Sequence, residues 1–277
     1  MNNRSLSKKI LIYLVLIVML IFALFPIYWM FITSFKTQAE VYSAIPIFWP
    51  KEFNFSSYKT LIYNTKFLVN IKNSLIVSLL VSIISILVSS LAAYAISRLK
   101  FRGRSTMSRS ILYAYLMPKS VLFIPLYILV TTLALNNSLY ALVLIYPTIT
   151  IPYATWMLIS YFKSIPKEIE EAAIVDGCSK FGSMIRIVFP LASPGIIATF
   201  IFSFTLCWCE YLYALVIISD TLNKTITLGL SDMVVGDIFA WGPLMGGSII
   251  ASIPVVIIYT LSSNFLVSGL TLGGVKQ

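Results

Sequence analysis

Six long apolar segments, separated by polar stretches, dominate the hydrophobic pattern of the chain. They are Ile10–Ile32, Ser74–Ser97, Ser110–Leu133, Ser138–Tyr161, Ser193–Ile218 and Pro243–Val267. Each has about the 20 residues that a helix needs to cross the hydrocarbon core of a bilayer. The pattern predicts an all-α, polytopic membrane protein with six transmembrane helices, the first of them kinked at Pro26.

The composition excludes a soluble domain. Of the 277 residues, 59% are hydrophobic and only 11% are charged, which is too little charge to cover a water-facing surface. A net charge of +10 would suggest a nucleic-acid partner in a soluble protein. Here the basic residues lie in loops between apolar segments, so membrane topology explains them better and no nucleic-acid partner is expected.

Basic residues occupy alternate loops, which sets the expected orientation. Those on one side are Arg4, Lys8 and Lys9 at the N-terminus, Arg98, Lys100, Arg102, Arg104 and Arg109 after the second segment, and Lys163, Lys167, Lys180 and Arg186 after the fourth. The opposite side has an uncharged turn at 134–137 and a loop with Asp220, Asp232 and Asp237. Because cytoplasmic loops are enriched in Lys and Arg, both termini are expected in the cytoplasm of a cell with the chain in its plasma (inner) membrane.

This topology divides the chain into successive regions. They are a cytoplasmic N-terminus (1–9), a first transmembrane helix (10–32), an external loop (33–73), a core of helices two to six (74–267) and a cytoplasmic tail (268–277). The first helix follows basic residues, as in a signal peptide, but it is too long for an h-region and no cleavage site follows it. We therefore expect it to be retained.

A long cytoplasmic loop, 162–192, interrupts the core and predicts a helical hairpin. Pro166 suits a first helical position, acids follow it in the first turns, and Gly177 lies where a left-handed cap would end the helix. A second helix begins at Ser179 and is expected to stop at Pro190. Its apolar stripe is Phe181, Met184, Ile185 and Val188. The hairpin could lie on lipid headgroups, but the acidic residues Glu168, Glu170 and Glu171 would be repelled by an anionic leaflet. The small side chains of Ala172 and Ala173 instead allow a protein partner to approach the helix backbone closely.

The spacing of these residues resembles the EAA loop of permease subunits of binding-protein-dependent ABC importers. Glu171, Ala172 and Ala173 are followed at the family's spacing by Gly177, Ile187 and Pro190, with Phe189 in place of the usual Leu. Pro166–Glu168 and Asp176 extend the resemblance, as do Trp208, Glu210 and Tyr211 and the tail 269–276. Together these resemble the maltose and multiple-sugar type, although Cys209 replaces the Asn usual before the acidic residue.

The resemblance implies a type I ABC importer permease fold and an assembly. Its members are a second homologous permease, two ATP-binding subunits and an external solute-binding protein that delivers a sugar, expected to be an oligosaccharide. ATP and Mg²⁺ would be used by the partner subunits, and this chain would bind no cofactor. The residues implied to contact an ATPase subunit are Glu170, Glu171, Ala172, Ala173, Asp176, Gly177, Ile187 and Pro190.

The residues themselves agree with a transport subunit that is not an enzyme. The chain has no His and no Gly-rich phosphate loop, so it should neither bind ATP nor perform general base catalysis. Cys178, Cys207 and Cys209 form no CxxC pair, so neither a metal site nor a catalytic residue is expected.

Two charges within apolar segments are candidates for a substrate path. Lys119 is expected near the middle of the third helix and Glu210 in the outer half of the fifth, where a charge is costly unless it faces a cavity or a partner. A direct ion pair between them is not expected, because their depths differ. Lys119 could instead snorkel or pair with the second permease, and Glu210 could make a structural hydrogen bond.

Aromatic residues complete the candidate path. Tyr153 and Trp156 in the fourth helix and Trp208 and Tyr211 in the fifth suit a sugar, whose CH faces stack on rings. The same residue types also form ordinary interfacial belts. Gly242 and Gly246 form a GxxxG, a weak indication of close helix packing.

Other functions remain open at the level of the sequence. Within the importer class, glycerol phosphate or another small polar solute could be the substrate, and Lys119 would suit an anion. A membrane-embedded enzyme would need clustered His, Asp or Glu, and an ion-coupled secondary carrier would need inverted repeats with midplane carboxylates. The chain has no His and few buried acids, which disfavours such an enzyme, and six helices with one long loop fit a carrier less well.

Overall fold

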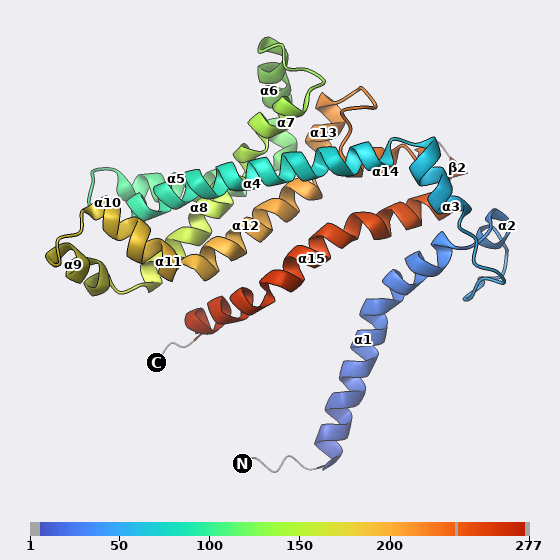
Figure 1. Ribbon diagram of the computed structural model, residues 1–277, viewed down its shortest axis with the longest axis horizontal. Helices are drawn as coiled ribbons and strands as arrows, with labels where there is room; N and C mark the ends of the chain where they lie inside the picture. Colours follow the sequence, from blue (N-terminus) through green and yellow to red (C-terminus); the bar gives the residue numbers. More distant parts are fainter. Residues whose placement is uncertain (1–5, 236–237, 275–277) are drawn as a thin grey trace. The chain divides into compact units, whose positions relative to one another are not determined.

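The computed structural model describes residues 6–235 and 238–274 (Figure 1). Arg4, Asp237, Val275 and Lys276, which entered the topology and resemblance arguments, lie outside the described residues. The longer helices are α1 (Leu6–Ser34), α4 (Phe67–Arg98), α5 (Arg104–Leu116), α6 (Lys119–Thr132), α8 (Pro147–Ser164), α12 (Ser193–Trp208) and α15 (Trp241–Gly274). The last of these extends into the predicted tail.

Short elements connect them. They are α2 (Gln38–Val41), α3 (Ser56–Lys59), α7 (Leu139–Ile145), α9 (Lys167–Val175), α10 (Lys180–Ser183), α11 (Phe189–Leu191), α13 (Leu212–Ile217) and α14 (Ile226–Ser231), with π-helical turns η1 (Thr60–Asn64) and η2 (Met184–Val188). A two-stranded antiparallel ribbon pairs β1 (Val234–Val235) with β2 (Ile238–Phe239). The chain forms two units, Met1–Phe67 with Leu230–Ile253, and Leu68–Gly229 with Pro254–Gln277.

Helix length and composition confirm the polytopic prediction. Among the described residues, 4 helices are long and apolar enough to cross a membrane, and up to 6 spans result if each of two bent helix pairs counts as one. On α1, most side chains from Lys8 to Ile27 are exposed, as expected for a helix whose surroundings are lipid.

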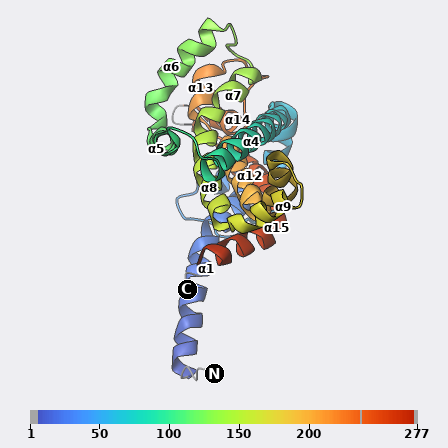
Figure 2. The ribbon, with the colours of Figure 1, turned by 90° about the vertical axis from the view of Figure 1, so that its left-hand side faces the viewer.

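The expectation of one continuous third helix and one continuous fifth helix is wrong. The third segment is broken between α5 and α6, which meet at a bend of 96°, so that Figure 2 shows α5 end-on while α6 runs across the view. Pro118 at the N-cap of α6 lacks the N–H that would continue α5. The fifth segment is broken where α12 ends at Trp208 and α13 begins at Leu212.

A buried stripe of serines runs along α4, and two of them contact α8 in the second unit. Ser82, Ser85 and Ser89 are fully buried, and their short side chains allow the helices to approach closely. The hydroxyls of Ser85 and Thr150 lie 2.6 Å apart, and Ser89 donates to the carbonyl of Ile151 at 3.2 Å. These hydrogen bonds satisfy polar groups that would be costly in hydrocarbon.

The hairpin within residues 162–192 and the break at Glu210 lie at different ends of this unit. Helices α9, α10 and α11 gather at one end of α4, α8 and α12, whereas α13 and α14 lie at the other (Figure 1). Buried Leu158 and Phe162 of α8 and Met184 and Val188 of η2 share one apolar core near the hairpin. This core connects the hairpin to the spanning helices.

In the first unit, the GxxxG of α15 packs closely, as the sequence indicated. A Cβ on Gly242 would lie 2.3 Å from Ser57 Oγ, and one on Gly246 would lie 3.3 Å from the ring of Tyr58. The ring of Phe35 contacts those of Phe53 and Phe55 edge-on, at centroid distances of 5.4 and 5.3 Å. The region predicted as an external loop is therefore structured and holds α2, α3 and η1.

Candidate functional site

The hairpin of the 162–192 loop is formed by α9, α10, η2 and α11, and glycine sets its turn. Gly177 has φ +93°, a left-handed conformation that glycine adopts without steric cost. Gly177 N–H donates to the carbonyl of Ile174 at 3.1 Å, and Cys178 N–H to that of Ala173 at 3.0 Å. This is the Schellman arrangement, which ends α9. Ser179 then caps α10 by accepting a hydrogen bond from Gly182 N–H at 3.0 Å.

Glu170 faces inward and ties the hairpin to α4. Its side chain is buried, and its Oε2 lies 3.2 Å from Arg98 Nε, although that N–H is not aligned for a hydrogen bond. Tyr94 O–H donates to the other carboxylate oxygen, and Arg98 also donates to the carbonyl of Ile165 at 2.8 Å. The last turn of α4 and Tyr94 thus hold both the middle of α9 and the residue at the end of α8 that leads into it.

In the second half of the hairpin, every other residue of the predicted apolar stripe is buried. Met184 and Val188 are buried, whereas Phe181 and Ile185 are exposed. The expectation that Pro190 ends the helix is wrong, because helical turns continue from Lys180 to Leu191. Pro190 cannot donate a hydrogen bond, and the preceding turn η2 is a π-helix, which shifts the bonding pattern before it. Ile187 is half-buried and Pro190 is exposed.

The opposite surface of the hairpin is exposed and mixes acidic and apolar side chains. We call it the outer face of the hairpin and define it as Glu171, Ala172, Val175, Asp176 and Phe181, all of which are exposed. Val175 is 86% exposed and Phe181 65%, which leaves two large apolar side chains uncovered in this chain. Ala173 is buried instead, so the alanine pair of the EAA pattern spans the two sides of α9.

An open cavity of about 380 Å³ lies beside the break between α12 and α13. It brings together three of the predicted path residues, Lys119, Glu210 and Tyr211. Sequence reasoning missed other lining residues, among them Phe202, Thr205 and Tyr259, because nothing in a single apolar helix marks the face that meets a cavity. Cys209, at which the sequence departs from the pattern it resembles, also lines it.

Glu210 has a structural task at this cavity. Its carboxylate accepts hydrogen bonds from the N–H groups of Tyr213, at 3.1 Å, and Ala214, at 3.3 Å, so it caps α13. Thr227 Oγ1 donates to the backbone carbonyl of Glu210 at 2.6 Å. Only 6% of the residue is exposed. The structural hydrogen bond that the sequence left open as an alternative is therefore present, and Glu210 also lines the cavity.

The expected depth of Lys119 is wrong. Because the third segment is broken, Lys119 is the first residue of α6 and not a mid-helix residue, and Tyr213 O–H donates to its carbonyl at 3.3 Å. Lys119 and Glu210 therefore line one cavity, although no ion pair joins them within the described part of the chain.

The aromatic candidates separate into two groups. Tyr153 stacks on Phe202, with ring centroids 3.7 Å apart, and Trp156 stacks on Tyr115 at 6.5 Å. Because Phe202 lines the cavity, Tyr153 lies directly behind its wall. Trp208 is 3% exposed and stacks on Phe204, with ring centroids 5.7 Å apart. It therefore packs in the protein interior and is not among the residues that line the cavity.

Spanning helices, a hairpin with an uncovered outer face and a cavity at a helix break define a membrane transport subunit. Residues 85–271 match the family described as the binding-protein-dependent transport system inner membrane component, and the chain belongs to this family. It is 39% identical to the inner membrane ABC transporter permease protein YcjP of Escherichia coli, over 99% of both chains.

Other relatives have named substrates. The chain is 32% identical to the diacetylchitobiose uptake system permease protein DasC of Streptomyces coelicolor, and 34% identical to the trehalose/maltose transport system permease protein MalG of Thermococcus litoralis, in both cases over 99% of each chain. A bacterial ABC transporter involved in alginate import matches with a TM-score of 0.82 at 20% identity, covering 96% of this chain and 100% of that one. This likeness confirms the expected ABC importer permease fold.

Proposed function

We propose that this chain is the membrane-spanning subunit of an ATP-driven importer that translocates a sugar, expected to be an oligosaccharide. Two full-length relatives at 32% and 34% identity carry the names of sugar permeases, for diacetylchitobiose and for trehalose and maltose. In the second unit, the cavity beside Glu210 offers polar and aromatic groups together, the combination that binds hydroxyl groups and CH faces.

The proposal includes the partners that such a subunit requires. A second homologous permease would complete the path, two ATP-binding subunits would supply ATP and Mg²⁺ chemistry, and an external solute-binding protein would deliver the sugar. This chain would bind no cofactor of its own. The observation that supports the ATPase contact is the outer face of the hairpin, where Val175 and Phe181 are uncovered next to acidic Glu171 and Asp176.

The Glu171→Lys variant tests the coupling role directly. Glu171 is exposed, so reversing its charge should not unfold the chain, but it should repel a complementary basic groove on the partner. We expect ATP-dependent uptake of labelled sugar to fall at least tenfold in cells that retain normal amounts of the chain in the membrane. Lys167→Glu, an exposed charge reversal on the same helix but outside the outer face, is the matched control. Normal uptake in the Glu171→Lys cells would remove the coupling assignment.

Glu210→Gln and Glu210→Ala separate a path role from a capping role. Gln keeps an oxygen that can accept the N–H groups of Tyr213 and Ala214, whereas Ala leaves them without that acceptor. If Glu210 contributes its charge to the path, both variants should lower sugar flux while the assembled complex still hydrolyses ATP. Full flux with Gln and failed assembly with Ala would show that Glu210 is a cap only.

Orientation is part of the same proposal. Both termini and the hairpin should be cytoplasmic, with 33–73 external. A cysteine engineered at exposed Lys180 should resist an impermeant maleimide added to intact cells, while one at exposed Phe55 should react. The reverse labelling pattern would overturn this topology.

A further inference from the structure

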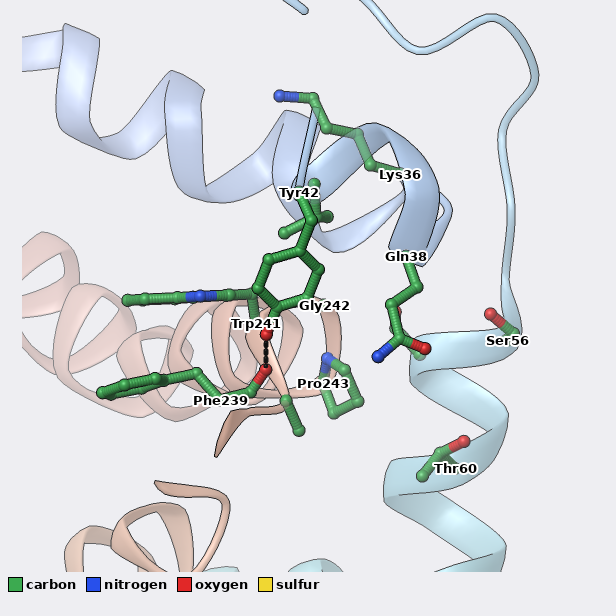
Figure 3. Close-up of a pocket in the computed structure, with 12 residues that line it drawn as sticks. Lys36, Gln38, Tyr42, Ser56, Thr60, Phe239, Trp241, Gly242 and Pro243 are labelled. Atoms are coloured by element: carbon green, nitrogen blue, oxygen red, sulfur yellow. Dashed lines mark hydrogen bonds between the residues drawn. The ribbon is translucent and has the colours of Figure 1, made fainter. Parts of the chain in front are cut away.

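A second pocket, of about 210 Å³, lies in the first unit, which does not contain the Glu210 cavity. It is formed by α2, the start of α3 and η1, and the segment that enters α15. Figure 3 shows its lining residues, which come from stretches far apart in the sequence. All three stretches, 36–42, 56–60 and 239–243, lie within or at the end of loops predicted to be external.

One wall of this pocket presents polar side chains that are not engaged within the described part of the chain. The Gln38 amide and the hydroxyls of Ser56 and Thr60 face the same space (Figure 3). None of these three side chains hydrogen-bonds to another described residue. Ser57 also lines the pocket, and its hydroxyl likewise makes no hydrogen bond to another described residue. A ligand with its own hydroxyl groups would supply hydrogen-bond partners to these donors and acceptors.

The other wall is aromatic. Phe239 and Trp241 stack with centroids 4.8 Å apart and an interplanar angle of 12°. Tyr42 lies beside them and is fixed there by donating its O–H to the carbonyl of Phe239 at 2.7 Å (Figure 3). Rings held in this way give an apolar surface of defined orientation, which suits the CH face of a sugar ring.

The charge at the pocket favours a neutral ligand. Lys36 contributes its stem, but its Nζ lies 3.9 Å from the centroid of the Trp29 ring and is turned away from Tyr42 and Gln38 (Figure 3). The ammonium group of Lys36 is therefore engaged in a cation–π contact with Trp29. The groups left facing the pocket are neutral donors and acceptors, so an anion has no charged partner among them.

We propose that this pocket binds one neutral pyranose unit of the transported sugar on the external side of the chain. Its polar wall would hydrogen-bond the hydroxyl groups of the sugar ring, and the ring of Trp241 would stack against the CH face of the sugar. The inference rests on the proposed function, because it takes the substrate to be a sugar. It adds a specific site outside the cavity beside Glu210.

Protection of an engineered cysteine tests the site in the assembled, purified transporter. Ser56→Cys lies on the rim, and Glu52→Cys is an exposed control that does not line the pocket. The rate of maleimide modification at each position is read by peptide mass spectrometry, with maltose, trehalose and diacetylchitobiose added separately and sorbitol as an acyclic control. At least one disaccharide should slow modification of position 56 several-fold and leave position 52 unchanged, and sorbitol should protect neither.

Variants of the aromatic wall then separate stacking from shielding by a partner. Trp241→Ala should abolish protection at position 56, whereas Trp241→Phe should retain part of it. The inference is wrong if no disaccharide protects, if position 52 is protected equally, or if position 56 does not react without sugar because a partner chain covers it. ATP-dependent uptake of the same sugars is measured in parallel. Uptake without protection contradicts this inference alone, and absence of uptake with protection contradicts the proposed transport function.

Discussion

Replacement of Gly177 by valine is expected to lower sugar uptake roughly tenfold or more while the chain remains in the membrane. A β-branched residue at φ +93° is strained whatever the surrounding space, and no atom within 4 Å would meet the added Cβ. The left-handed conformation costs about 1–2 kcal/mol for a residue with a Cβ, and about 1.4 kcal/mol corresponds to a tenfold change in an equilibrium. The Gly177→Val substitution should therefore open the Schellman cap and misplace the outer face of the hairpin.

Two controls isolate the backbone effect in this uptake assay. Gly177→Asn should retain most of the activity, because asparagine tolerates the left-handed region at a helix C-terminus. Gly103→Val introduces a comparable strain outside the hairpin, at φ +86° and again with no atom within 4 Å of an added Cβ. It should affect uptake less than Gly177→Val. Equal loss in all three variants would contradict a specific role for the hairpin turn.

Breaking the buried pair between Arg98 and Glu170 is the second change with a large expected effect. Glu170→Ala leaves Arg98 uncompensated in a buried position, which typically costs about 3–5 kcal/mol. We expect a lower unfolding temperature for the purified complex and loss of uptake. The exposed Glu171→Lys should lose uptake without that thermal shift, because Glu171 forms no ion pair with another described residue.

A double variant decides whether the pair stabilises the hairpin as an ion pair. Replacing both members by apolar residues of similar size, in Arg98→Met with Glu170→Leu, should recover much of the unfolding temperature, since paired replacement of buried charges is often neutral. Additive losses in the double variant would show that Arg98 and Glu170 act independently. Uptake in the double variant then reports whether anchoring by α4 is sufficient for coupling.

The sequence predicted the hairpin well because its signals are local. A proline at the start, acids in the first turn and a glycine at the end of α9 each act within a few residues, and the structure shows the glycine cap with its two hydrogen bonds. The inward position of Glu170 could not be predicted in this way. It depends on Tyr94 and Arg98, which are brought beside it by the packing of α4 and carry no sign of that contact in the sequence.

The helix breaks escaped prediction for a related reason. Apolar periodicity reports membrane-spanning length, and it is insensitive to a bend within an apolar segment. Pro118 is a local signal that could have marked the break before Lys119, whereas Cys209–Tyr211 contains neither glycine nor proline. The cavity that unites Lys119 with Glu210 follows from these breaks, so depth counted along ideal helices placed the two residues too far apart.

Sugar uptake by proteoliposomes that contain the assembled transporter tests the central claim most directly. ATP is supplied on the hairpin side, the solute-binding protein on the other, and labelled maltose, trehalose or diacetylchitobiose is followed across the membrane. We predict uptake of at least one sugar that requires ATP hydrolysis and the binding protein, persists in ionophores and is lost in Glu171→Lys. Uptake driven by a proton or sodium gradient without ATP would contradict the account and identify an ion-coupled carrier.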